Sequence, residues 1–149
     1  MAGIKGRATT EGEIALAAAT AKTILQIVAA SNHRVLIRGY AFSFDGTSST
    51  AEPVQVSINK QTTAGTMSSA TPVKNGDYGE TLQTTAQKTA TAEPTTTDVY
   101  ARYDIHPQSG LEVALGVGDE LIVPGGGRIA ITCTAPAAVN VTGHFVFEE

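Results

Sequence analysis

Strict alternation of apolar and polar residues is the feature of this chain that most constrains its fold. Between residues 53 and 60, the apolar residues Val54, Val56 and Ile58 alternate with polar ones. Successive side chains of a β-strand point to opposite faces, so a period of two predicts a strand with one buried face. Strand-like patterns, separated by turn-forming residues, also occur at residues 22–29, 33–44, 98–105, 119–123, 128–134 and 139–147.

Together with a short segment at residues 111–115, these patterns predict seven or eight short strands. Many short strands joined by turns are typical of sandwiches and jelly rolls. We therefore expect an all-β protein with an antiparallel, jelly-roll-like β-sandwich. A helix over residues 11–30 is an alternative at the start, because residues 11–22 are rich in alanine. The β-branched residues within 23–28 favour a strand there, and the structure of residues 13–18 stays open.

The middle of the chain lacks this alternation. Residues 61–97 consist mainly of Thr, Ala, Ser and Gly, which are too polar to form a core of their own. We expect them to form one long insertion loop in a single sandwich domain over residues 13–149. Residues 1–12 are polar and are expected to form a flexible N-terminal arm.

Composition argues against nucleic acid and membranes as binding partners. The net charge is −4 and the ten Lys and Arg residues are scattered, so we expect no nucleic-acid binding. The chain has no run approaching the roughly 20 apolar residues of a membrane helix, and residues 1–12 do not resemble a signal peptide. We expect a protein made in a reducing cytoplasm that does not enter a membrane. Cys133, the only cysteine, is in phase with Ile129 and Ile131 and should be a small buried hydrophobe.

The pattern of polar residues predicts no catalytic centre. The histidines His33, His106 and His144 are isolated from one another in sequence. Residues 118–126 (GDELIVPGG) fit the turn–strand–turn frame of the second cupin motif, but no histidine follows and no His-x-His occurs. Imidazoles that converge on a metal are therefore missing. We expect no catalytic residue, no metal and no cofactor.

Five residues are the candidates for an interface. Both faces of residues 33–44 are apolar, and we expect Tyr40, Phe42 and Phe44 to share the face that a neighbouring subunit covers. Lys5 and Arg7 lie in the predicted arm, which could extend across an acidic neighbour.

The second half of the chain carries a resemblance. It rests on residues 103–107 (YDIHP), 118–126 (GDELIVPGG) and 143–149 (GHFVFEE). From about residue 98 onward, the chain resembles small β-sandwich structural proteins of tailed bacteriophages, in particular capsid decoration (cement) proteins. The resemblance implies a non-enzymatic homotrimer that binds the major capsid protein on the outside of the virion. It transfers no individual functional residue.

Two other functions are alternatives. One is a glycan- or receptor-binding β-sandwich, in which exposed aromatic rings would stack on the ligand. The chain has no Trp, so its candidate rings are Tyr40, Tyr78, Tyr100 and Tyr103. The other is a divergent cupin enzyme, for which bound metal would be the distinguishing observation.

Overall fold

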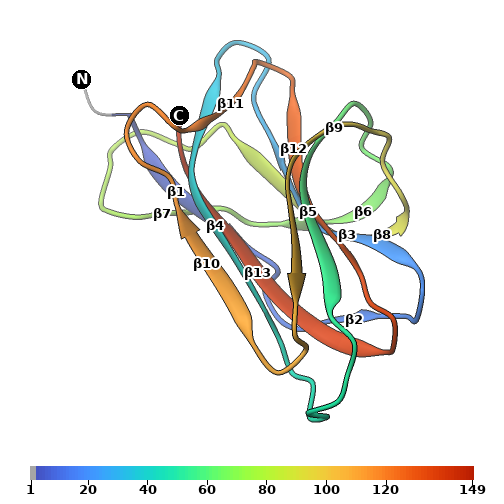
Figure 1. Cartoon of the computed structure of the whole chain (residues 1–149). Coiled ribbons are helices and arrows are strands. Elements are labelled where there is room, and N and C mark those ends of the chain that lie inside the picture. Colours follow the sequence, from blue (N-terminus) through green and yellow to red (C-terminus); the bar gives the residue numbers. More distant parts are fainter. Residues whose placement is uncertain (1–2) are drawn as a thin grey trace.

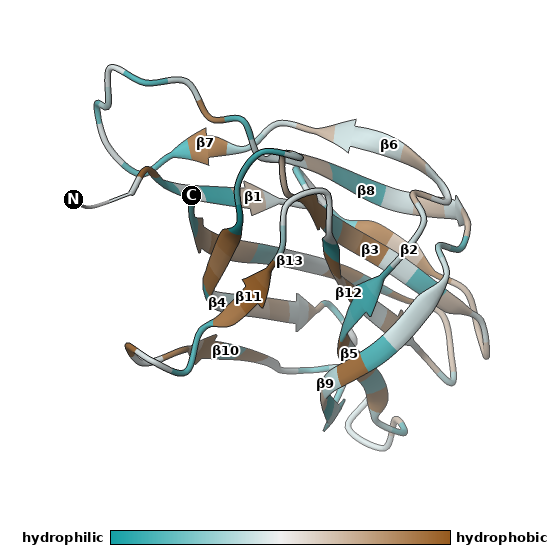
Figure 2. Ribbon diagram, turned by 90° about the horizontal axis from the view of Figure 1, so that it is seen from above, coloured by the Kyte–Doolittle hydropathy of each residue, from teal (hydrophilic) through white to brown (hydrophobic). Residues whose placement is uncertain are grey.

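The protein is a sandwich of two antiparallel sheets in a computed structural model that describes residues 3–149. The two layers are seen in Figures 1 and 2. The seven-stranded sheet consists of β1 (Lys5–Thr9), β2 (Ile14–Leu16), β4 (Val35–Phe44), β7 (Val73–Lys74), β10 (Gly110–Ala114), β11 (Leu121–Val123) and β13 (Val139–Glu148). The six-stranded sheet consists of β3 (Ala21–Val28), β5 (Val54–Gln61), β6 (Thr66–Ala70), β8 (Thr85–Ala92), β9 (Thr96–Ile105) and β12 (Arg128–Thr134).

The order of the strands explains which parts of the chain are central. The seven-stranded sheet has the order β10-β4-β13-β1-β7, with β11 beside β4 and β2 beside β13, and the six-stranded sheet has the order β6-β8-β3-β12-β5-β9. The predicted all-β sandwich is confirmed, while the jelly-roll connectivity stays a prediction. Residues 14–16 and 21–28 form strands, so the helical alternative for residues 11–30 is wrong.

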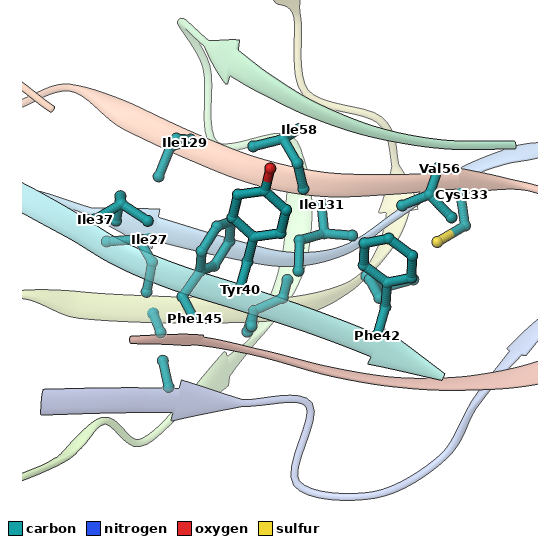
Figure 3. Close-up of a cluster of buried hydrophobic side chains, with 14 of the residues drawn as sticks. Ile27, Ile37, Tyr40, Phe42, Val56, Ile58, Ile129, Ile131, Cys133 and Phe145 are labelled. Carbon is teal, nitrogen blue, oxygen red and sulfur yellow. The ribbon is translucent and has the colours of Figure 1, made fainter. Parts of the chain in front are cut away.

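The core lies between the two sheets (Figure 3). Ile27 and Ile131 of the six-stranded sheet are fully buried, as is Phe145 of the facing sheet. Cys133 is also fully buried, as predicted, and its burial raises the pKa of the thiol to about 12. The alternating patterns therefore identified the core-facing sides of most strands correctly.

A β-bulge in β4 changes which residues of this strand face the core. Phe147 of β13 lies opposite Ile37 and Val146 lies opposite Gly39, so Arg38 is an extra residue in β4. An extra residue reverses the alternation beyond it. Tyr40 and Phe42 consequently point inward and are only 4% and 2% exposed, next to Ile37 on the same face.

The predicted interface role of Tyr40 and Phe42 is therefore wrong, because both rings lie in the core of their own chain. The Tyr40 hydroxyl forms a hydrogen bond with the Tyr103 hydroxyl at 2.7 Å, and the Phe42 ring contacts that of Tyr103. Phe44 is half-buried and packs against the same core.

The predicted flexible arm is also corrected. Residues 5–9 form β1, which pairs with β13 on one side and β7 on the other. Ala8 is fully buried while Lys5 and Arg7 are exposed, so the segment alternates as a strand does. It has only five residues and its buried side chains are small, so the sequence pattern did not reveal it. Residues 1 and 2 of the predicted arm lie outside the described residues.

The predicted insertion loop over residues 61–97 is wrong as well. This segment contains β6, β7, β8 and the start of β9. Because β5 lies near one edge of its sheet and β6 forms the other edge, the chain crosses the outer face of the sheet after β5 and crosses back before β9. We call the crossing segments, residues 62–65 and 93–95, the straps.

The straps are bonded to each other. The Thr62 amide donates to the Thr95 carbonyl at 2.9 Å, and the Thr95 amide donates to Thr63 Oγ1 at 2.8 Å. Threonine serves in both straps because its hydroxyl can satisfy a nearby backbone group outside a regular ladder. The Thr-rich segment therefore consists of the two straps and of strands that include β6 and β8, at one edge of the six-stranded sheet.

Candidate interaction surface

The central part of the outer face of the six-stranded sheet is a polar surface that the straps bury. Thr23, Gln26, Asn59 and Gln61 on this face are each at most 2% exposed. Gln26 Nε2 donates to Gln61 Oε1 at 2.6 Å and to the Thr63 carbonyl of the first strap at 3.2 Å. Gln61 Nε2 in turn donates to Thr23 Oγ1 at 2.9 Å. The side-chain amides are thus bonded to the sheet and to the chain that covers it.

Glu93 of the second strap completes this network. Its carboxylate accepts the Thr23 amide at 2.9 Å and the Thr23 hydroxyl at 2.7 Å. Thr132 Oγ1 lies 3.0 Å from Thr23 Oγ1 and accepts from Asn59 Nδ2 at 3.1 Å. Buried polar groups require such partners, because an unpaired one carries the full cost of desolvation. The part of this face beneath the straps therefore serves the fold and is not available to a partner. Gln55, Arg102 and Asp104, farther along the same face, stay exposed.

The outer face of the seven-stranded sheet differs in that its side chains are not covered. Thr9, His144, Ala41 and Glu112 lie opposite one another across β1, β13, β4 and β10 and so share this face. We define the open face by its outward residues, each half-buried or exposed: Lys5, Arg7, Thr9, Ala41, Ser43, Glu112, Ala114, Thr142, His144 and Val146.

A groove of about 650 Å³ lies on the open face. Ala41, Ser43 and Thr142 are among its lining residues, and the turn after β1 forms its rim with Glu11 and Gly12. Small side chains on adjacent strands allow another polypeptide to approach the sheet closely. The groove is lined by both apolar and polar groups, as protein contact surfaces are.

His144 is the titratable side chain at the centre of this groove. Burial lowers its pKa below the ordinary value, the positive charge of Arg7 lowers it further, and the Glu112 carboxylate opposes the shift. The ring is therefore neutral at pH 7 and presents its uncharged edge among small residues. Its Nε2 atom is buried without a hydrogen-bond partner. The His144 ring therefore contributes to the contact surface of the groove.

A second hollow of about 560 Å³ lies at one end of the sandwich. Its lining includes Leu16, Val54 and Pro136, with Asp45 and Glu52 among the polar residues. The Asp45 carboxylate is already engaged, since the amide and side chain of Asn140 each donate to it at 2.9 Å. These hydrogen bonds hold the pKa of Asp45 below its ordinary value. The carboxylate at this end thus orders the loop that follows β4.

Of the five predicted interface residues, the structure keeps two at the surface of one sheet face. Lys5 and Arg7 are exposed on the open face, whereas Tyr40 and Phe42 are buried and Phe44 is half-buried. Sequence reasoning missed His144, Ala41 and Thr142 as members of this face. The alternation of residues 139–147 is consistent with an outward His144, but the register that brings it beside Ala41 could not be derived from one sequence.

Within residues 3–149, no group of three or more His, Cys, Asp or Glu side chains is placed to hold a metal ion. The same residues contain no helix that is long and apolar enough to cross a membrane.

Comparisons with known proteins found no similar protein. No family model matches the chain, no curated protein matches it, and no solved structure matches its fold.

Proposed function

We propose that this protein is a non-enzymatic structural protein of a phage virion, which binds the outside of the capsid shell and stabilises it by bridging capsid subunits. In this proposal the protein is made in the host cytoplasm, has a jelly-roll-like fold, forms a homotrimer and contacts the major capsid protein. The resemblance of residues 98–149 to capsid decoration proteins motivates the class of protein.

The observation that carries the proposal is the difference between the two outer faces. The centre of one face is covered by the straps of its own chain, while the open face presents small side chains and a groove of about 650 Å³. Antiparallel sheets tolerate one solvated face, and a flat solvated face with short side chains suits close contact with a broad partner surface. A shell protein needs this kind of area, since many weak contacts in one assembly add to a strong attachment.

Lys5 and Arg7 place two positive charges on the open face, on the strand next to the edge strand β7. Both side chains are exposed on β1, whose pairing with β13 and β7 holds them in place. Cations held on a rigid strand lose less conformational entropy on binding than cations on a flexible arm. An acidic patch on the capsid subunit is the complementary surface that these charges would favour.

The test is co-sedimentation of the purified protein with capsids of the phage that encodes it, prepared without this protein. We expect saturable binding, and we expect Arg7→Glu to weaken it about tenfold through charge repulsion. Arg34→Glu is the matched control, because Arg34 is exposed in the loop before β4 and the change in charge is the same. Absence of wild-type binding, or equal weakening by both variants, would contradict the proposal.

The glycan-binding alternative loses two of its four candidate rings. Tyr40 is buried, and its hydroxyl is bonded to that of the half-buried Tyr103. Tyr100 is 45% exposed and is the most accessible large aromatic residue that could stack on a sugar. Glycan binding by the wild type that is lost in Tyr100→Ala would favour this alternative over the capsid proposal.

A further inference from the structure

The two lateral sides of the sandwich are closed to different extents. One side lies between β1 and β7 of one sheet and β6 and β8 of the other. Its core-facing residues Ala8, Ala70, Ala86 and Ala90 are small and at most 6% exposed. Glu11 closes this side by pairing with Lys88 and accepting the Thr71 amide at 2.7 Å. We call it the closed side.

The opposite side is bordered by β9 of the six-stranded sheet and by β10 and β11 of the seven-stranded sheet. We call it the seam. Most of the half-buried hydrophobic residues that pack against the core lie along it: Ala101, Tyr103, Ile105, Leu111, Val113, Leu115 and Leu121. Figure 2 shows the hydrophobic colouring of β10 and β11 at this side. The core is therefore incompletely covered at the seam.

The exposed hydrophobic residues gather at the same side. Among residues 3–149, five large hydrophobic residues are exposed, and four belong to β9 or to the β10–β11 segment: Val99 (40%), Tyr100 (45%), Val117 (95%) and Ile122 (54%). The fifth, Val73 (55%), lies on β7 at the closed side. Clustering of this kind marks a contact surface, whereas single exposed hydrophobic residues are ordinary.

Both strands at the seam have an unpaired edge. Within the described chain, β9 pairs with β5 alone and β10 with β4 alone. The extra residues of β9, Thr97 and Tyr100, fall in its first half, so residues 101–105 pair regularly with β5. That regular run has five residues and β10 also has five. Because only four residues connect the end of β9 to the start of β10, the two edges run in opposite directions.

The charges on the two edges are complementary. Arg102 on β9 and Glu112 on β10 are both exposed, and within residues 3–149 neither takes part in an ion pair. A rotation about an axis along the strands places β9 of one copy antiparallel to β10 of the next. In that arrangement Arg102 of one copy can approach Glu112 of its neighbour, and the apolar seams converge on the axis.

We propose that the seam is the contact surface between copies of this chain, with β9 of one copy facing β10 of the next in a closed ring. The number of copies, three, rests on the proposed function. The choice of the seam as the contact surface rests on its exposed hydrophobic residues, strand edges and charges. A head-to-tail contact of this kind covers the core-facing hydrophobic residues and both strand edges at once. Of the residues that define the open face, the charge contact uses Glu112 at the β10 edge, and the residues on β1 and β13 stay free.

The experiment measures the mass of the full-length protein by light scattering over a dilution series. We expect a multiple of the 15.4 kDa chain mass, three by the proposed function. Ile122→Lys should lower the association constant at least tenfold, because it places a charge at the seam. Val73→Lys should leave association unchanged, and it is matched because the two side chains are 54% and 55% exposed.

A charge exchange tests the pairing of the edges. Arg102→Glu should weaken association by about tenfold, and the added Glu112→Arg should restore most of it. A wild-type monomer at every concentration, or an oligomer that Ile122→Lys and Arg102→Glu both leave intact, would overturn the inference. Capsid binding by such a monomer would leave the proposed function standing, whereas an oligomer that fails to bind capsids would contradict the function alone.

Discussion

The outer faces of the two sheets are built from similar residues but differ in what covers them. Thr23 on the six-stranded sheet is fully buried, whereas Thr142 on the seven-stranded sheet is half-buried beside Ser43. Both are threonines on central strands, and both hydroxyls bond to a neighbouring hydroxyl at 3.0 Å. The difference is that the straps cross one face and nothing in the described chain crosses the other. Residue type alone therefore does not tell whether a polar sheet face is closed or free.

The largest effect on stability is expected at Thr23, beneath the straps. Thr23→Val keeps the shape of the side chain but removes the nearest acceptor of Gln61 Nε2 and one of the donors to the Glu93 carboxylate. Unpaired buried polar groups should lower the free energy of unfolding by about 2–3 kcal/mol. Urea denaturation followed by circular dichroism measures this loss.

Thr142→Val is the control on the open face. Its hydroxyl bond to Ser43 is exposed, and water can replace it. We expect a change within about 0.5 kcal/mol. Equal losses for Thr23→Val and Thr142→Val would show that the straps do not make the two faces different.

A second test concerns the crossing of the first strap. Gly65 has a φ of +62°, and an added Cβ would overlap the Ala92 carbonyl and Pro94. Gly65→Ala should lower the free energy of unfolding by about 1–2 kcal/mol through backbone strain and overpacking. Gly79→Ala, where nothing lies within 4 Å of the new Cβ, should have almost no effect. Thermal unfolding of the two variants distinguishes a tightly fitted strap from a loose one.

Low pH should destabilise the seven-stranded sheet at the ion pair between Arg38 of β4 and Glu148 of β13. Hydrogen bonds from Arg38 hold the pKa of Glu148 below its ordinary value of 4.5, while partial burial opposes them. A carboxyl whose pKa is lower in the folded state stabilises the fold above its unfolded pKa, and this contribution is lost as the pH falls through the folded pKa.

We therefore expect stability to fall as the pH drops below 4.5, the ordinary pKa of a glutamate. Arg38→Gln should make this decline shallower, and Arg34→Gln, at an exposed arginine in the preceding loop, should not. Urea midpoints measured across this pH range report the difference. An identical decline in both variants would exclude the Arg38–Glu148 pair as its cause.

The smallest effect on stability is expected at the groove itself. Ala41→Gln places a longer polar side chain on the open face, where it can extend into the groove. The free energy of unfolding should change by no more than about 0.5 kcal/mol, whereas binding to the proposed capsid partner should be lost. A large loss of stability would mean that Ala41 packs within its own chain.

Much of the fold could be predicted because alternation records burial directly. The predicted strand over residues 128–134 matches β12 at both ends, and that over 139–147 differs from β13 by one residue. The site could not be predicted in the same way. Tyr40 and Phe42 were assigned to the wrong face because the bulge at Arg38 depends on how β4 pairs with β13.

The Thr-rich segment was misjudged for a different physical reason. A core-facing strand needs large apolar residues only where it faces large space, and β8 fills its narrow place with Ala86 and Ala90. Its backbone groups form hydrogen bonds with the neighbouring strands β3 and β6, so β8 is stable without an alternation of large apolar residues. Composition therefore resembled that of a loop, although the segment is ordered.

By itself, the sequence determined the class of this protein: alternating Val, Ile and Phe residues require two apolar sheet faces that pack together. The tertiary structure alone decided which outer face is free, because the straps that cover one sheet come from a distant part of the chain. It also decided that Lys5 and Arg7 are held on β1 of the uncovered sheet. Local periodicity reports whether a side chain is buried, whereas coverage of a face depends on contacts between segments far apart in sequence.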